Sequence, residues 1–423
     1  MAVDRYSIVG ATAELVESLG GRVAKETRSG IVFASLSREQ VEKLKEQGCR
    51  VKPVSGVCPA ILPPVTPPVP IAGMPVYTPE QLVVGVGFDR IRDLAVPPLY
   101  GEGFNLAIVD TGIRETHEKI NGRVVYSKNF TASPPGDGFD HGTGVASIAL
   151  AVAPHCNLLD FKVLGDDGYG TDEDVVMALD DLLVMHDDGS EYAPHVVNLS
   201  LGEPDDGDPY NPLRMASRAL VERGIWVIAA AGNAGPGPGT VMTPACERYV
   251  VAVGSVSYEP FQISQFSGRG PTQEGLVKPD IVLFGENIAM ASSHSDTSVT
   301  AKSGTSFAAP FASGMVILYH NAILVHGAQY SPEEAPEAVY HQLLQLVSPE
   351  QMIDRYLGAL SIKPEGAPRT KDESYGWGVP YGPLVTQAFA RKTAMADVMG
   401  MVVPIIGIGF MGMMMSGMVK AMR

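Results

Sequence analysis

The stretch Asn105–Gly112 reads NLAIVDTG, an apolar run that ends in an acidic residue and a turn. Such a run, bounded by polar residues, is typical of a strand that is buried on both faces. Similar runs end at or near Val163, Leu199, Ala230 and Val253, and helix-like segments separate them. This alternation predicts an α/β fold with a mainly parallel sheet. Ligands of such sheets bind outside the carboxyl ends of the strands, so we examine the polar residues there first.

Composition narrows the possible classes of protein. A chain of 423 residues that is 45% hydrophobic is too apolar to be disordered and too long for one minimal domain. Only 18% of the residues are charged, yet the formal net charge is −16. Because nucleic-acid binders present a basic face, we expect no nucleic-acid partner. Four scattered cysteines suggest neither a disulfide framework nor a zinc site and are predicted to be reduced structural thiols.

Four polar residues stand in glycine-rich settings at the ends of predicted elements. Asp110 follows the strand quoted above, and His141 lies in DHGTGVA at the start of a small-residue helix. Asn233 follows the strand GIWVIAAA, and Ser306 lies in SGTSFAAP at the start of another helix. Taken singly, each is an ordinary turn or capping residue. Together, an acid, a histidine, an amide donor and a serine are the groups that acyl transfer requires.

At these residues the sequence resembles the subtilisin-like serine protease family. The family signatures stand here as AIVDTGI around Asp110, HGTGVA at His141 and GTSFAAP at Ser306. The chain order Asp, His, Ser is that of subtilisin. The resemblance covers residues 86–392 and implies a doubly wound, mainly parallel sheet and a serine endopeptidase that acts on proteins or peptides. The alternative is an inactive subtilase fold that serves as a binding or scaffold module.

The resemblance also implies a role for each matching residue. Ser306 would be the nucleophile, His141 the general base, and Asp110 the carboxylate that orients the imidazole. Asn233 matches the asparagine of the oxyanion hole. The segment around Ser200, Leu201 and Gly202 resembles the backbone that pairs with an extended substrate. Ala230, Ala231 and Gly232 match the other wall of the S1 pocket, and Met242 aligns with its floor, which implies a shallow apolar pocket.

Two positions depart from the family pattern. Gly144 replaces a second histidine that many members carry, and Lys119 replaces an aspartate that commonly ligates calcium. The usual calcium site is therefore not expected, and no cofactor is required. The acidic loop Glu203–Asp208 could hold calcium weakly through oxygen ligands, although a solvated loop is favoured.

Residues 1–54 predict a small separate unit. They read as strand, helix, strand, strand, helix and strand, the order of a ferredoxin-like α+β domain. The unit resembles the family's inhibitor propeptide, of the I9 type. It carries nine basic and seven acidic residues, so its net charge is +2 and the rest of the chain carries −18. One predicted docking surface is the helix that begins at Thr171, whose first turn contains Asp172, Glu173 and Asp174; the alternative is that these acids only cap the helix.

Residues 55–85 form the predicted connection between the small unit and the protease. The segment is rich in closely spaced prolines, which favour extended polyproline-like backbone without a sheet ladder. If the chain follows the family, Ser306 cuts it within this linker and the protein is made as a self-inhibited precursor.

The C-terminal segment 398–419 is predicted to be a transmembrane anchor. Its 22 residues carry no charge, and as a helix they would span about 33 Å. The alternatives are a buried helical hairpin and a partner-binding tail. The N-terminus lacks the apolar run of a signal peptide, so the expectation is a tail-anchored protease that faces the cytoplasm.

Overall fold

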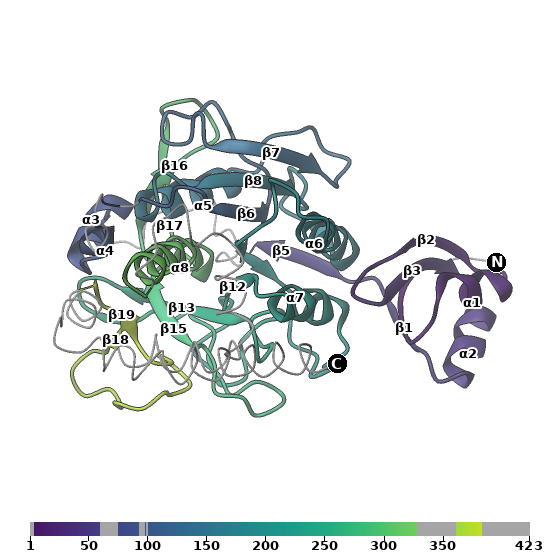
Figure 1. The fold of residues 1–423 in the computed structure, drawn as a ribbon. Coiled ribbons are helices and arrows are strands. Elements are labelled where there is room, and N and C mark those ends of the chain that lie inside the picture. Colours follow the sequence, from purple (N-terminus) through teal and green to yellow (C-terminus); the bar gives the residue numbers. More distant parts are fainter. Residues whose placement is uncertain (1–3, 60–74, 93–97, 99, 328–360, 383–423) are drawn as a thin grey trace, which may run out of the picture.

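The computed structural model describes residues 4–59, 75–92, 98, 100–327 and 361–382, with the backbone alone for residues 320–327. Figure 1 shows a small N-terminal unit beside a larger α/β unit. A short strand, β5 (Gly56–Pro59), leads from the small unit into the large one.

The small unit has the predicted ferredoxin-like α+β topology. Its four strands form an antiparallel sheet in the order β2-β3-β1-β4. Ser37 accepts a hydrogen bond from the Gln40 N–H, and the Gln40 side chain accepts one from the Ser37 N–H, which fixes the start of α2. The elements are β1 (Asp4–Val9), α1 (Ala13–Ser18), β2 (Arg22–Glu26), β3 (Ile31–Leu36), α2 (Arg38–Glu46) and β4 (Arg50–Pro53).

The large unit is built on the predicted, mainly parallel sheet. The strand order is β14-β13-β12-β10-β6-β8-β7, with β15 also paired to β13, and only the β13–β14 pair is antiparallel. The strand quoted at the outset, β6, lies near the middle and is buried throughout. The strands are β6 (Asn105–Asp110), β7 (Val124–Asn129), β8 (Asn157–Lys162), β10 (Val196–Leu199), β12 (Trp226–Ala230), β13 (Val251–Ser257), β14 (Gln262–Ile263) and β15 (Ile281–Phe284).

Helices cover both faces of this sheet, as the doubly wound prediction requires. Leu106 and Ile108 point into the core that contains α5 (Gly142–Val152) and α8 (Thr305–Gly327). Ala107 and Val109 point into the opposite core, which contains α6 (Asp172–Asp187) and α7 (Pro212–Glu222). Because successive side chains of a strand alternate between faces, one strand contributes to both cores.

Smaller elements complete the large unit, and one of them is a helix at the end of the predicted linker 55–85. Helix α3 (Pro79–Gly85) packs on α5, with Leu82 and Val83 buried, so its residues belong to the core of the large unit and not to an open connection. Thr78 and Gln81 cap it reciprocally. The remaining elements are α4 (Asp89–Arg92), β16 (Ile288–Ala291), β17 (Val299–Lys302), β18 (Ser361–Ile362) and β19 (Val379–Pro380).

Strand β5 contradicts the prediction of no sheet ladder for the first residues of the linker, while residues 60–74 lie outside the described residues. It lies between β9 (Gly170–Thr171) and β11 (Leu201–Gly202) and is antiparallel to both. The backbone edges of β9 and β11 in the large unit provide the hydrogen-bonding partners that a Pro-rich segment lacks within itself. Pro59 stands at the end of the strand, where a missing N–H is tolerated.

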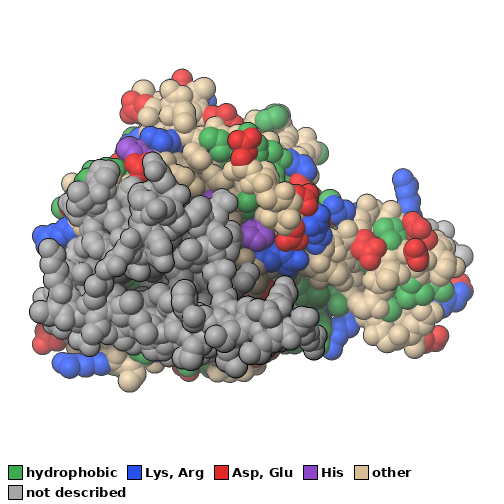
Figure 2. All heavy atoms as spheres, viewed as in Figure 1, with side chains coloured by type: hydrophobic (Ala, Val, Ile, Leu, Met, Phe, Trp, Pro, Cys, Tyr) green, Lys and Arg blue, Asp and Glu red, His purple; other side chains and the backbone are tan. Residues whose placement is uncertain are grey.

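Ion pairs join the small unit to the acidic surface of the large one. Arg5 Nε donates to Glu173 Oε2 at 2.7 Å, on the first turn of α6 that the sequence analysis singled out. Lys52 Nζ lies 2.7 Å from Asp206 Oδ2 and 2.6 Å from Asp208 Oδ2. Figure 2 shows basic and acidic side chains gathered where the two units meet. The charge complementarity expected from the sequence is therefore present at this junction.

The remaining predictions concern the cysteines and the tail. All four cysteines are free thiols, and burial raises the pKa of both Cys156 and Cys246 to about 12. Within the described residues, no helix is both long and apolar enough to cross a membrane. The segment 398–419 lies outside the described residues, so the transmembrane anchor stays a prediction.

Candidate active site

The structure brings Asp110 and His141 together at the carboxyl end of the sheet. Asp110 is the last residue of β6, and His141 precedes the first turn of α5. His141 Nδ1 lies 2.7 Å from Asp110 Oδ1, and both side chains are fully buried. Since the ionised carboxylate only accepts, Nδ1 carries the proton and Nε2 is left as the acceptor. In the part of the chain that is described, Nε2 has no hydrogen-bond partner.

Ser306 lies in the first turn of α8, next to this pair. The ring of the following residue, Phe307, has its centroid 5.2 Å from that of His141. The Ser306 hydroxyl donates to the Ser200 carbonyl at 2.8 Å, and the Ser200 hydroxyl donates to the Ser306 carbonyl at 2.8 Å. The serine predicted to be the nucleophile thus lies on the same helical turn as the residue whose ring lies near that of His141, and its hydroxyl is bonded to Ser200.

Asn233 presents a free amide group in the same region. Its Oδ1 accepts hydrogen bonds from the Thr305 N–H at 2.9 Å and the Thr305 hydroxyl at 3.0 Å. Because an N–H can bond only to the oxygen, these contacts fix the orientation of the amide. Its Nδ2 is buried and has no partner among the described atoms. A buried donor without an acceptor costs free energy, so the position of this amide group calls for an explanation.

The predicted substrate-pairing backbone is occupied by the chain itself. Leu201 and Gly202 form β11, and they pair with Pro59 and Cys58 of β5. On the other side, Val57 pairs with Gly170 of β9, and its side chain is 1% exposed. An extended segment thus lies between two strands in the manner of an added-strand ligand.

The residues predicted to line the S1 pocket also lie together. The Met242 N–H donates to the Ala231 carbonyl at 2.9 Å. Gly232 has a φ of 100°, and a Cβ there would lie 2.4 Å from Met242 Cγ, so a side chain larger than hydrogen cannot be accommodated. Gly202 lies against the other side of Met242, and Ala230 ends the strand that leads to this wall.

The departures from the family pattern have local physical reasons. A Cβ on Gly144 would lie 2.5 Å from Met290 Sδ, so there is no room for a histidine. Lys119 Nζ pairs with Glu80 Oε1 of α3 at 2.9 Å, where the family carries a calcium ligand. Of the acidic loop, Asp206 and Asp208 face Lys52. Within the described residues, no cluster of three or more acidic, histidine or cysteine residues could hold a metal.

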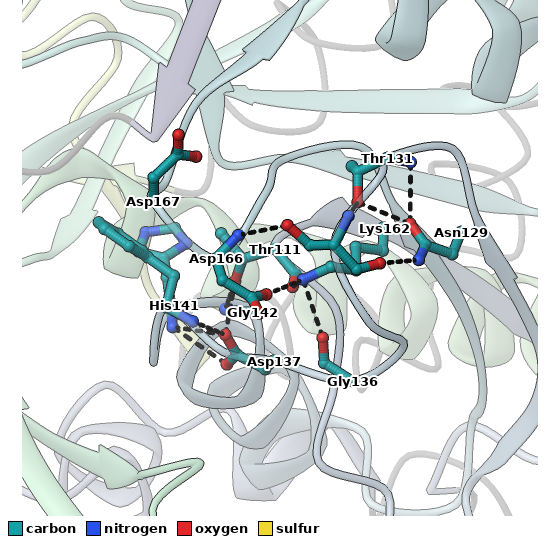
Figure 3. A network of polar contacts seen from close by, with 12 residues as sticks. Thr111, Asn129, Thr131, Gly136, Asp137, His141, Gly142, Lys162, Asp166 and Asp167 are labelled. Atoms are coloured by element: carbon teal, nitrogen blue, oxygen red, sulfur yellow. Dashed lines mark hydrogen bonds and ion pairs between the residues drawn. The ribbon is translucent and has the colours of Figure 1, made fainter.

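Sequence reasoning missed Asp137, which organises the start of α5. His141 occupies the capping position of that helix but makes no side-chain cap. Asp137 caps the helix in place of His141, because its carboxylate accepts hydrogen bonds from the N–H groups of His141 and Thr143 at 3.0 and 2.9 Å. It also accepts from the Thr111 hydroxyl at 2.8 Å, which links the loop to the residue after Asp110 (Figure 3). The sequence signal that could have identified Asp137 is an acidic residue shortly before the start of a helix.

Two carboxyl groups near the site have strongly raised pKa values. Burial and the nearby Glu203 carboxylate raise the pKa of Asp172 to about 7. Asp172 Oδ1 accepts from the Ser55 N–H at 3.0 Å, and the Ser55 hydroxyl donates to Glu203, so both acids face the start of β5. Burial also raises the pKa of Asp160, on β8, to about 7.

Comparison with known proteins gives consistent matches. A family model described as the subtilase family matches residues 101–378. Serine protease AprX of Bacillus subtilis (strain 168) is 30% identical over 273 residues, which are 56% of this chain and 61% of that protein. A subtilisin of Bacillus sp. (strain TA39) is 31% identical over 242 residues, covering 51% and 56% of the two chains. The chain therefore spans less than two thirds of these two relatives. Subtilisin Savinase of Lederbergia lenta is 33% identical over 231 residues, covering 52% and 77%.

Proposed function

This chain belongs to the subtilase family, and on that premise we propose that it is a serine endopeptidase acting on protein or peptide substrates. The observation that carries the proposal is the buried bond of 2.7 Å between His141 Nδ1 and Asp110 Oδ1, which leaves Nε2 without a partner among the described residues, near the first turn of α8 that contains Ser306. Such a pair is the base and orienting carboxylate of a triad.

The proposed reaction starts with the Ser306 hydroxyl turning from the Ser200 carbonyl to His141 Nε2. Ser306 Oγ attacks the carbonyl carbon of the scissile bond, and its proton passes to Nε2. Asp110 stabilises the imidazolium that results. His141 then gives this proton to the departing amine, and the acyl group stays on Ser306. A water molecule, deprotonated by His141, hydrolyses the acyl-enzyme and regenerates the serine.

Asn233 is proposed to stabilise the negative charge that develops on the substrate oxygen. Its Nδ2 is buried and unbonded among the described atoms, while its Oδ1 is held by Thr305. A donor that is fixed before the reaction costs no reorganisation when the charge forms. The backbone N–H of Ser306 is proposed as the second donor, as in the family.

We further propose that the chain is a self-inhibited precursor whose N-terminal unit is an inhibitor propeptide. The support is β5, which occupies the strand position between β9 and β11 that a substrate would take. Removing the inhibitor then requires a cut after β5, within the predicted linker 55–85. In this proposal Ser306 makes that cut in its own chain.

Reaction with a fluorophosphonate probe tests the activity and separates it from the alternative of an inactive scaffold. The probe phosphonylates a serine only if an activated base removes its proton. We expect labelling of Ser306 in the wild-type chain after release of the N-terminal unit, and none in His141→Ala. An unlabelled wild-type chain from which that unit has been removed would support the scaffold.

The membrane anchor at 398–419, with the protease on the cytoplasmic side, remains a separate proposal that rests on the absence of charge in that segment. Extraction of intact protein from membranes by alkaline carbonate without detergent would count against it.

A further inference from the structure

We propose that two lysines, Lys162 and Lys302, are positioning residues that hold the loop preceding the catalytic base. This loop, Gly136–Asp140, is called the histidine loop below because His141 follows it directly. The inference rests on the proposed peptidase function, because it concerns how the triad is kept in register.

Lys162 ties the first residue of the histidine loop to the loop that carries the acid. It is the last residue of β8 and stands opposite Asp110 in the parallel register. Its Nζ donates to the Thr111 carbonyl at 2.6 Å, the Gly136 carbonyl at 2.9 Å and Asp166 Oδ1 at 2.8 Å (Figure 3). All three protons of the ammonium group are thus used, and the side chain is only 2% exposed.

Lys302 ties the last residue of the histidine loop to the strand that leads to the nucleophile. It ends β17, four residues before Ser306. Its Nζ donates to the Asp140 carbonyl and lies 3.0 Å from Asp140 Oδ2, and the side chain is 8% exposed. Asp140 Oδ1 also accepts from the Ser293 N–H at 2.6 Å.

Asp140 needs this support because of its backbone. Its φ is 69°, in the left-handed region that a residue with a side chain seldom adopts. The Lys302 ammonium and the Ser293 N–H hold its carboxylate, and Lys302 lowers the pKa of that carboxyl despite its burial. The strained residue is the one immediately before His141, so a change in its backbone would move the imidazole directly.

The two lysines therefore fix the histidine loop at both ends, one from the side of the acid and one from the side of the nucleophile. Burying an ammonium group costs free energy, which is recovered only when its hydrogen bonds are complete. Hydrophobic packing could hold a loop at lower cost. The three catalytic side chains come from three separate elements, and their mutual distances must stay correct to a fraction of an ångström for proton transfer.

The test compares Lys162→Met and Lys302→Met with Lys278→Met in the full chain. Lys278 is an apt control because it is also buried, with Nζ 2.6 Å from the Val250 carbonyl and 2.6 Å from Asp280 Oδ2, but it contacts neither the histidine loop nor the triad. For each variant, kcat and KM on a peptide p-nitroanilide, the rate of fluorophosphonate labelling and the melting temperature are measured.

We expect Lys162→Met and Lys302→Met to lower kcat and the labelling rate about 10- to 100-fold, with little change in KM, because the triad is displaced but the substrate cleft is not. Lys278→Met should lower the melting temperature and leave kcat within about twofold of wild type. Lys302→Arg should regain most of the lost rate, since a guanidinium can donate to both Asp140 oxygens.

Equal labelling rates in wild type, Lys162→Met and Lys302→Met would overturn the inference, with the peptidase proposal intact. A wild-type chain that is not labelled after release of its N-terminal unit would instead overturn the peptidase proposal. If Lys162→Met does not fold, Lys302→Met and Lys302→Arg decide the question, because Lys302 lies nearer the surface.

Discussion

At the scale of single residues, the His141 side chain could either cap α5 or bond to Asp110. This residue stands where a helix normally requires a capping side chain, and the imidazole makes no cap. Asp137 supplies the acceptor for the first N–H groups of α5, four residues earlier in the chain. The imidazole is therefore free to bond to Asp110. At Asn233 the oxygen is bonded to Thr305, and the amide nitrogen, which has no partner among the described atoms, is the proposed donor to the substrate oxyanion.

The Asn233→Ala variant tests the second of these assignments. We expect kcat to fall about 10²- to 10³-fold, the size of the effect that losing the corresponding donor has in subtilisin. KM should change little, because the hydrogen bond forms only as the oxyanion develops. Steady-state kinetics on a peptide substrate measure both constants. An unchanged kcat would remove Asn233 from the mechanism.

The sequence alone singled out Asp110, His141, Asn233 and Ser306, because each lies in a short glycine-rich signature, and the structure brings Asp110 and His141 into contact. Lys162 and Lys302 escaped notice for a physical reason. Each donates to a backbone carbonyl of a loop distant in sequence. Every residue has a backbone carbonyl, so the residue type at the acceptor position does not reveal such a bond.

At the scale of elements, the register of β5 allows the most specific prediction. Its partner strands pair Cys58 with Gly202 and Pro59 with Leu201. The next residue of the protease strand, counting back from Leu201, is Ser200, whose carbonyl accepts the Ser306 hydroxyl. The sequence suggested an open polyproline linker here because composition describes the segment alone, whereas the strand depends on edges contributed by β9 and β11.

This register predicts where the chain is cut. If the pairing continues by one residue, the residue after Pro59 comes opposite Ser200, so the expected cut lies between Ala60 and Ile61. Both residues lie outside the described residues, and the position follows from counting along the strand. Mass spectrometry should find an N-terminal fragment that ends at Ala60.

An insertion separates register from sequence preference. With one glycine inserted after Pro59, the N-terminal fragment should end at that glycine, because Val57 remains buried between the same strands. Cleavage that still follows Ala60 in the insertion variant would contradict the register argument.

The carboxyl pair at the start of β5 predicts a pH dependence. The pKa of Asp172 is raised from 3.8 to about 7, so the folded state holds a proton that the unfolded state releases. Its contribution to stability is complete below about pH 4 and is lost as the pH rises through about 7. Asp160 titrates over the same range, so a paired comparison is needed.

The comparison uses the Ser306→Ala chain, which stays uncut, with and without Asp172→Asn. We expect the melting temperature of the parent to fall between pH 4 and pH 7 more steeply than that of the asparagine variant, whose side chain at 172 does not titrate. Parallel curves would show that Asp172 does not contribute to the pH dependence.

At the scale of the whole molecule, the acidic large unit and the mildly basic N-terminal unit are joined by ion pairs, by strand β5 and by Ile31 and Phe33, which are buried in the core that contains α6 and α7. The sequence predicted this division of charge, and the structure shows which groups carry it. Exposed ion pairs are individually weak, worth about 0.2–1 kcal/mol each, and salt screens them. If the N-terminal unit is the proposed inhibitor, these pairs are the part of the contact that a change of charge can weaken, while β5 and the buried Ile31 and Phe33 form the rest of it.

Charge reversal at the junction should therefore speed release of the N-terminal unit after cleavage. Lys52→Glu places a like charge beside Asp206 and Asp208, and we expect a shorter lag before full activity. The matched control is Lys43→Glu, because among the described residues Lys43 pairs with Glu39 on its own helix and with no group of the large unit. Equal lags in the two variants would show that the junction pairs do not govern release.

The most direct test of the central claim is the intact mass of the wild-type chain compared with that of Ser306→Ala. If Ser306 is the nucleophile of a self-processing protease, the wild type yields two fragments, the smaller ending near β5, and Ser306→Ala yields one uncut chain. The same two fragments from both proteins would show that the cut does not depend on Ser306 and would contradict the account.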